Sequence, residues 1–402
     1  MSLLRRYGQV LALPGARGAL LASTVGRISA GMAGLALILL IRERGGSYGL
    51  AGVCAAAFAL GFAVLSPVRA RKADKRGQTG VLLASAAGFP AGLLGVLLVT
   101  ESGLPLGLAA IGAAFSGAFF PPFGPSMRTI WAGIEDLPVR SSAFALEAVL
   151  VEVSFVLGPL AVAVGQALGG PRLALLGAAG FGGLGALLLA RNPMSRAWKP
   201  HGERSSDPLG PLRSAMVRRL LLATLCVGVG FGAVDVAVPA FAEQHHSLGA
   251  SGVLLALWSL GSMVGGLVYG GVNPRRPAIE QYRLLLIGVA VASALPLLAW
   301  SIPGLGLLLL LFGLAIAPFF ITNSHLIADY APAGTTTEAF AWMATAIFGG
   351  AAVGNAVAGG LVSATGSPRG AFAVAAVMGF AAFVSSLLTS SRQAVGSTTV
   401  QA

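Results

Sequence analysis

The chain has 402 residues, of which 56% are hydrophobic and 10% are charged, and its mean hydropathy is +0.84. This balance excludes a soluble globular domain and is typical of a membrane protein. The formal charge of +12 does not indicate nucleic-acid binding, because the basic residues lie between long apolar runs instead of gathering on a polar face. Cys54 and Cys226 lie inside such runs, so we expect no disulfide framework, no metal site and no cofactor.

Apolar segments long enough to cross a bilayer, at about 20 residues each, follow one another along the whole chain. In the first half they lie at residues 19–41, 48–67, 80–99, 104–126, 142–164 and 171–190. In the second half they lie at residues 218–241, 249–271, 283–300, 305–326, 338–362 and 369–389. We therefore predict an all-α integral membrane protein of twelve helices. Two six-helix bundles, residues 1–190 and 218–402, are joined by a polar, proline-rich linker at 191–217.

The basic residues predict the orientation, since cytoplasmic loops retain Lys and Arg. With the N-terminus inside, 21 Lys and Arg residues fall in the inner segments and 4 in the outer loops. This asymmetry predicts that the N- and C-termini and the linker are cytoplasmic.

The two halves share an internal repeat, which many transporters contain. A shift of 200 residues places Gly52 on Gly252 in the second and eighth helices, and the pair Phe119-Phe120 on Phe319-Phe320. A shift of 196 places Gly158 on Gly354 in the fifth and eleventh helices. Chance matches are the alternative, because Ala, Gly and Leu are abundant, but the order of the matches favours duplication.

A basic segment at residues 70–78 follows the second helix and reads Ala-Arg-Lys-Ala-Asp-Lys-Arg-Gly-Gln. It resembles the cytoplasmic signature of the major facilitator superfamily, which is Gly, two residues, Ala-Asp-Arg, one residue and Gly-Arg. Asp74 and Gly77 match, whereas Ala70 and Gln78 depart from the pattern. The resemblance covers about the whole chain and implies a twelve-helix fold. It also implies a gating loop in which Asp74, Arg71, Arg76 and Gly77 contact helix ends of the other half; alternatively, the basic residues only set the topology.

Gly158 and Pro159 in the fifth helix are similar to the Gly-Pro signature of the antiporter branch of that family. Glycine lets helices approach closely, and proline removes one helical hydrogen bond, so a helix bend is expected here. Ordinary helix packing is the alternative. The equivalent position in the eleventh helix carries Asn355, which either contacts substrate or cross-links helices.

Four charged residues, Arg27, Glu147, Glu152 and Asp235, fall inside predicted helices. Each costs about 2.5–3.5 kcal/mol at the bilayer centre, so they must face the interior, a partner or water. At 1.5 Å per residue, Arg27 lies about 12 Å and Glu152 about 14 Å from the cytoplasmic ends of their helices. We therefore predict an Arg27–Glu152 ion pair, either protonation-switched or static, and expect Glu147 to contact the basic segment instead.

Asp235 lies in the seventh helix without an obvious partner. In the resembled fold, the first, fourth, seventh and tenth helices line a central cavity, which places Asp235 near substrate. A carboxyl in a low-dielectric site retains its proton to higher pH, which suits proton exchange.

Uncharged cavity candidates are aromatic or amide side chains, several of them beside Pro121, Pro122 and Pro318, where kinks are expected: Phe119, Phe120, Phe319, Phe320, Asn323 and Asn355. Helix packing is the alternative role for the aromatic residues. A mostly apolar, aromatic cavity would suit a lipophilic organic substrate.

An enzyme or primary pump is not expected, because none of the three lysines precedes Ser or Thr and no phosphate-binding loop can be assembled. We expect a monomeric secondary transporter that exports small organic compounds in exchange for protons. The excess of Arg over Lys suggests a GC-rich bacterial genome and hence a plasma membrane. The alternatives are an importer of polar nutrients and a transport-inactive membrane scaffold or regulator.

Overall fold

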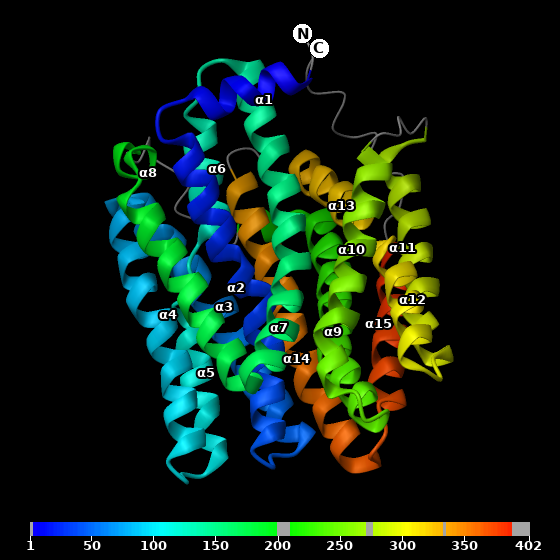
Figure 1. Ribbon diagram of the computed structural model, residues 1–402. Helices are drawn as coiled ribbons and strands as arrows, with labels where there is room; N and C mark the ends of the chain where they lie inside the picture. The colour runs from blue at the N-terminus through cyan, green and yellow to red at the C-terminus, as the bar shows by residue number, and fades with distance from the viewer. Residues whose placement is uncertain (1–2, 199–209, 271–275, 333–334, 388–402) are drawn as a thin grey trace.

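The structure is a computed structural model that describes residues 3–198, 210–270, 276–332 and 335–387. Within these ranges every regular element is a helix (Figure 1). The first half contains α1 (Leu3–Ala12), α2 (Ala16–Glu43), α3 (Tyr48–Arg76), α4 (Gln78–Glu101), η1 (Leu106–Leu108), α5 (Ala109–Ala118), α6 (Phe123–Ala132), α7 (Leu137–Arg191) and α8 (Pro193–Ala197). The second half contains η2 (Gly210–Arg213), α9 (Ala215–Gln244), η3 (Leu248–Ala250), α10 (Ser251–Gly270), α11 (Ala278–Ala294), η4 (Leu295–Leu298), α12 (Ile302–Gly313), α13 (Ile316–Tyr330), α14 (Thr336–Thr365) and α15 (Arg369–Leu387).

The described residues contain 11 helical segments that are long and apolar enough to cross a membrane. One of them, Ser142–Arg191, is 50 residues long, twice what a crossing requires. The backbone leaves the helical region at Gly169 and at Gly170, where φ is 74°, so this segment turns back within its length. The arrangement therefore fits the twelve predicted crossings.

The predicted fourth helix is broken into α5 and α6 by the residues between Ala118 and Phe123. Pro121 and Pro122 cause the break, because neither has a backbone N–H to donate to the preceding turn. The guanidinium of Arg69 on α3 donates to the carbonyl oxygen of Ala118 at 2.7 Å and to Ser85 Oγ at 2.6 Å. It thus satisfies a carbonyl at the end of α5 that has lost its helical partner.

Residues 70–78 do not form the predicted loop. The segment continues α3 to Arg76, and only Gly77, with φ of 84°, separates it from α4. Ala, Arg and Lys are strong helix formers, so the helix persists until a glycine permits the left-handed turn. Arg76 is exposed. The side chains of Arg71 and Asp74 lie outside the described residues, so the gating role of this segment remains a prediction.

Of the predicted linker 191–217, residues 199–209 lie outside the described part of the chain.

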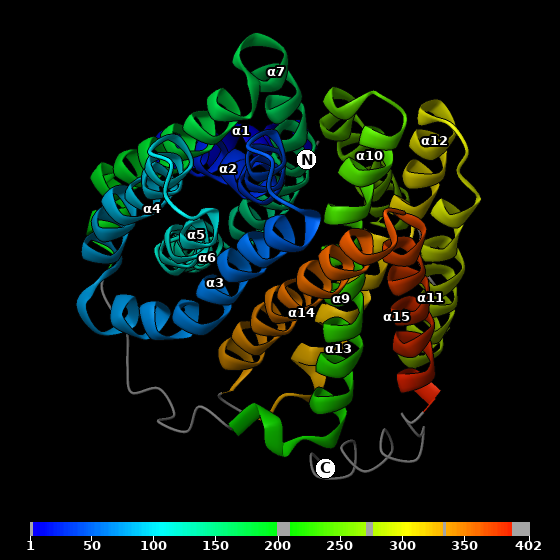
Figure 2. The same cartoon turned by 90° about the horizontal axis from the view of Figure 1, so that it is seen from below.

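The helices gather in two groups, α2 to α7 and α9 to α15, which meet where α3 packs on α14 and α7 packs on α10 (Figure 2). Glycines allow both contacts. A Cβ added to Gly52 would overlap the carbonyl oxygen of Asn355, and one added to Gly252 would overlap that of Pro159. The predicted repeat relates the two contacts, since Gly52 is equivalent to Gly252 and Pro159 to Asn355. The groups therefore touch through a pseudo-symmetric pair of small-residue contacts.

Within the second group, α9 and α14 pack backbone to backbone through glycines four residues apart. These are Gly228 and Gly232 on α9, and Gly350 and Gly354 on α14. Such small-residue spacing lets membrane helices approach closely and gain van der Waals contact. The contact fixes α9, whose membrane-spanning window is 78% buried.

This packing predicts that Gly354→Ala destabilises the protein. The new methyl group would overlap the carbonyl oxygen of Val229, and overpacking of this kind costs about 1–3 kcal/mol. We expect a lower midpoint of thermal unfolding for the detergent-purified variant. The matched control is Gly360→Ala on the same helix, where a Cβ would meet nothing within 4 Å. Equal midpoints for the two variants would contradict the packing described.

Candidate functional site

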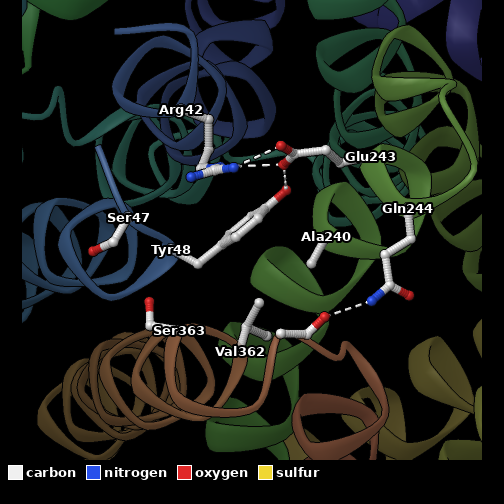
Figure 3. A pocket seen from close by; sticks show the side chains of 9 residues that line it. Arg42, Ser47, Tyr48, Ala240, Glu243, Gln244, Val362 and Ser363 are labelled. Atoms are coloured by element: carbon white, nitrogen blue, oxygen red, sulfur yellow. Dashed lines mark hydrogen bonds and ion pairs between the residues drawn. The ribbon is translucent and has the colours of Figure 1, made fainter. Parts of the chain in front are cut away.

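Three side chains from different helices join the two groups at one end of the molecule: Arg42 near the end of α2, Tyr48 at the start of α3 and Glu243 near the end of α9 (Figure 3). Arg42 donates from Nε and Nη2 to the two carboxylate oxygens of Glu243 at 3.1 and 2.6 Å. Tyr48 donates its hydroxyl proton to Glu243 at 2.6 Å, and the Arg42 guanidinium lies 4.3 Å from the centre of the Tyr48 ring. We call these three residues the clasp.

The clasp borders a cavity of about 360 Å³ between the two groups. A second cross-group hydrogen bond runs beside it, from the backbone N–H of Gly49 to Ser363 Oγ at 2.6 Å. The side chains of Arg42 and Glu243 remain 22% and 39% exposed, so water weakens their attraction to the order of 1 kcal/mol. The clasp can therefore hold this end closed and still open reversibly.

Sequence reasoning missed the clasp, although a signal was present. The shift of 200 residues places Glu43, next to Arg42, on Glu243. Opposite charges thus lie at the same depth on equivalent helices, and comparing helix ends across the repeat would have identified the pair.

The buried ion pair of the first group joins Arg27 to Glu147, so the predicted Arg27–Glu152 pair is wrong. Glu147 pairs with Arg27, and its predicted contact with the basic segment involves side chains outside the described residues. The Nη2 of Arg27 lies 2.6 Å from the Glu147 carboxylate, and the two residues are 8% and 5% exposed. The angular position of each acid around the axis of α7 decides which of them reaches Arg27. Glu147, Ser154 and Gly158 share the face of α7 that contacts α2, whereas five residues place Glu152 about 140° away from Glu147.

Gly158 also lies on that face, where an added Cβ would be 2.7 Å from the Cα of Gly31. Backbone torsions remain helical through Gly158 and Pro159. Both residues pack against other helices. Gly158 contacts α2, and Pro159 contacts Gly252 of the other group. A bend at this position remains a prediction.

Asp235 lies on α9 and is only partly buried, whereas most of its neighbours are fully buried. From residue 226 to residue 242, every residue of α9 is buried except Phe231 and Asp235. Within the described part of the chain, Asp235 forms no hydrogen bond or ion pair, and the same holds for the partly buried Glu152. Because the membrane-spanning window of α9 is 78% buried, we infer that its two partly buried residues point towards the space between the groups rather than towards lipid.

Two aromatic clusters lie in the interior, one in each group. Phe120, in the break between α5 and α6, packs edge-on against Phe58, Phe62 and Phe89, with ring centres 5.4–6.2 Å apart. Phe62 then contacts Phe348 of the other group at 4.1 Å. In the second group, Phe231 packs against Phe320 and Trp258. Phe120 and Phe320, which the repeat relates, each belong to one of these clusters, and their role in lining a cavity remains a prediction.

Three of the other cavity candidates are buried instead of lining a cavity. Phe319 and Asn323 are fully buried, and Asn323 donates to Thr224 Oγ1 at 3.0 Å. Asn355 is 4% exposed between α3 and α9. Phe119, partly buried, packs on Phe115 and fills the space above Gly88. Phe319 and Phe320 lie within α13, where successive residues are about 100° apart, so only one of them can face the centre. Phe119 and Phe120 lie beyond the end of α5, in the break before α6.

The sequence matches the Major Facilitator Superfamily over residues 19–335 and again over residues 220–401, the second match beginning in the first helix of the second half. The chain belongs to the major facilitator superfamily. It is thus a multi-pass membrane protein whose fold supports membrane transport.

Solved transporters share this superfamily fold. The nucleoside transporter NupG, as a point mutant, has a TM-score of 0.75 and 12% identity and covers 93% of this chain and 99% of its own. A peptide transporter, POT, in complex with sulfate, has a TM-score of 0.71 and 13% identity and covers 95% of this chain and 96% of its own. The human organic anion transporter MFSD10 (TETRAN) has a TM-score of 0.62 and 19% identity and covers 92% of this chain and 98% of its own. No curated protein sequence matches the chain.

The buried pair predicts that Glu147→Gln is much more damaging than Glu152→Gln. Removing one member of a buried pair leaves the other charge uncompensated, at a cost of about 3–5 kcal/mol. Thermal unfolding of the purified variants measures the difference. Glu152→Gln serves as the matched control, because it removes an acid from the same helix without breaking a described contact. A larger decrease in the midpoint of thermal unfolding for Glu152→Gln would contradict the Arg27–Glu147 pair and favour the pair of Arg27 with Glu152.

The clasp predicts that Glu243→Gln opens its end of the molecule. Ala240 lines the cavity and is 3% exposed, so a cysteine at this position reports separation of the groups. In an Ala240→Cys background, we expect Glu243→Gln to accelerate labelling by a membrane-impermeant maleimide about fivefold, since a clasp of about 1 kcal/mol would be lost. Glu43→Gln, which changes the exposed acid next to Arg42, should leave the rate unchanged. Equal rates in both variants would show that the clasp does not hold the groups together.

Proposed function

We propose that the protein is a secondary transporter of a bacterial plasma membrane that exports small organic compounds in exchange for protons. The observation that carries this proposal is Asp235, a partly buried acid on an interior helix that has no partner among the described residues. A carboxylate in such a position is costly unless a proton or a cation neutralises it. Asp235 is therefore suited to bind and release a proton once in each cycle.

The other intramembrane acids are less suited to this role. Glu147 is neutralised by Arg27 within 2.6 Å and is buried inside one group, so a change in its protonation would leave Arg27 uncompensated. Glu152 is partly buried on α7 and remains a second candidate for proton transfer, independent of Arg27.

Transport would proceed by rocking of the two groups about the glycine contacts of α3 with α14 and of α7 with α10. The clasp would close the outer side, because the positive residues of the sequence favour cytoplasmic termini and place the ends of α2 and α9 outside. The segment 70–78, with Asp74, would act at the opposite, cytoplasmic side. Each half of the cycle then breaks one weak set of polar contacts.

The lining favours a lipophilic substrate over a polar one. The accessible side chain beside Asp235 is Phe231, which is backed by Trp258 and Phe320, and the first group contributes Phe120 and Phe62. The solved relatives are named for nucleosides, peptides and organic anions, so the fold accommodates several substrate classes and the side chains must select among them.

The proposal is tested by transport in two stages. First, cells expressing the wild type or Asp235→Asn are challenged with a panel of lipophilic compounds, and the compound with the largest difference in tolerance is selected. Its movement and that of protons are then measured in proteoliposomes under an imposed pH gradient. We expect opposite fluxes of compound and protons in the wild type and no proton flux with Asp235→Asn. Asp329→Asn, at an exposed acid near the end of α13, is the control.

Three outcomes would contradict the proposal. Wild-type coupling in Asp235→Asn would remove Asp235 from the mechanism. Fluxes in the same direction would indicate an importer. Absence of substrate-dependent flux for every compound would favour a scaffold or regulator.

A further inference from the structure

Between residues 226 and 242, only two residues of α9 are less than fully buried, Phe231 and Asp235, and they carry an aromatic ring and a carboxyl. Phe231 and Asp235 are four residues apart, so they lie on the same face of the helix, one turn above the other. All other residues of this stretch are buried. A molecule that enters the space between the groups at this height therefore meets these two side chains together.

The ring of Phe231 packs against two further aromatic rings. Its ring packs edge-on against Trp258, with centres 4.9 Å apart and an interplanar angle of 86°, and against Phe320 at 6.0 Å. Trp258 itself contacts Phe312 at 5.5 Å. These contacts come from α10, α12 and α13 and hold the ring of Phe231 in place, so the aromatic wall is pre-organised and does not assemble on binding.

No described cation neutralises Asp235. Arg27, a group of opposite charge at membrane depth, is bound to Glu147 in the first group. Arg42 is bound to Glu243 at the end of α9. The carboxyl must therefore be neutral when the site is empty, or be neutralised by whatever occupies it.

We propose that Asp235 and Phe231, supported by Trp258 and Phe320, bind the positive group of an organic monocation with an apolar body. The carboxylate supplies the opposite charge, and the rings supply cation–π attraction and apolar contact. This inference rests on the proposed function, since it assigns the substrate class at the same carboxyl. Binding exchanges one positive charge for another: the proton leaves the Asp235 carboxyl for the solvent as the cation binds the resulting carboxylate.

The test uses two probes of the same shape and opposite charge, tetraphenylphosphonium and tetraphenylborate. Binding to the purified full-length protein is measured by isothermal titration calorimetry in two buffers of different protonation enthalpy, which also counts the protons released. We expect the wild type to bind the phosphonium and release close to one proton for each ion bound. Tetraphenylborate should bind at least about tenfold more weakly, because it would place an anion beside a carboxyl.

The variants separate the charge from the ring. Asp235→Asn should weaken phosphonium binding at least about tenfold and abolish proton release, the usual effect of losing a charged partner. Phe231→Leu should weaken binding about threefold or more and leave proton release intact, because it removes only the ring. Asp235→Glu should restore most of the affinity, and Asp329→Asn should resemble the wild type.

Phosphonium affinity within about twofold of wild type in Asp235→Asn, or equal affinity for the two probes, would overturn the inference. If either result accompanied intact proton-coupled export of an uncharged compound in proteoliposomes, the proposed function would stand and only the assignment of a cationic substrate would fail. If coupled export were lost for every compound but phosphonium binding still depended on Asp235, the cation site would stand and the proposed function would fail.

Discussion

The free-energy cost of removing a charged side chain from water determines where the charged residues of this protein lie and which partners they have. A charged side chain at membrane depth costs about 2.5–3.5 kcal/mol, and partial burial of a charge at a helix end is also costly unless a partner neutralises it. The charged residues of this fold meet this cost in three arrangements. Arg27 and Glu147 neutralise each other inside one group of helices, with both residues less than a tenth exposed. Arg42 and Glu243 neutralise each other across the two groups. Asp235 is partly buried and has no partner among the described residues. The first pair is buried within one group, and the second is partly solvated between the two groups. For Asp235, we propose that a proton or a ligand supplies the balancing charge.

The packing between the groups complements this division of charge. The contacts of α3 with α14 and of α7 with α10 bring glycine against backbone, and Phe62 packs on Phe348 beside the first of them. Such contacts can hinge without breaking a buried polar network. The clasp adds weak, partly solvated polar bonds at one end, and the internal repeat makes the two glycine contacts equivalent. These features are the contacts about which we propose that the two groups rock.

Much of the fold could be predicted from the sequence, because a bilayer leaves the backbone few choices. Apolar length gave the membrane-spanning segments, and the repeat gave the equivalence of Gly52 with Gly252 that the structure uses at the interface. The proline pair at 121–122 correctly indicated a broken fourth helix. The segment 70–78 was misread as a loop because its charges suggested solvent, although its residues favour helix until Gly77.

The candidate site was harder to predict, because a site depends on rotation and partner choice as well as depth. Depth in the membrane alone predicted a pair of Arg27 with Glu152. In the structure, the face of α7 that contacts α2 carries Glu147 instead. The same omission placed Phe319 and Asn323 in a cavity, although both are buried within their own group. The clasp joins residues that are about 200 positions apart in sequence, and only the packing of α2 beside α9 brings them together. Asp235 was recognised because an unpaired acid within an apolar helix is conspicuous without any knowledge of its neighbours.

We propose that a proton or a ligand balances the charge of Asp235. Infrared difference spectroscopy of the carboxyl C=O stretch, with and without tetraphenylphosphonium, tests it most directly. The account predicts a protonated-carboxyl band in the empty wild-type protein that disappears on binding, is missing from Asp235→Asn and persists in Asp329→Asn. A band that is unchanged in Asp235→Asn, or an Asp235 that remains ionised in the empty protein, would contradict the account.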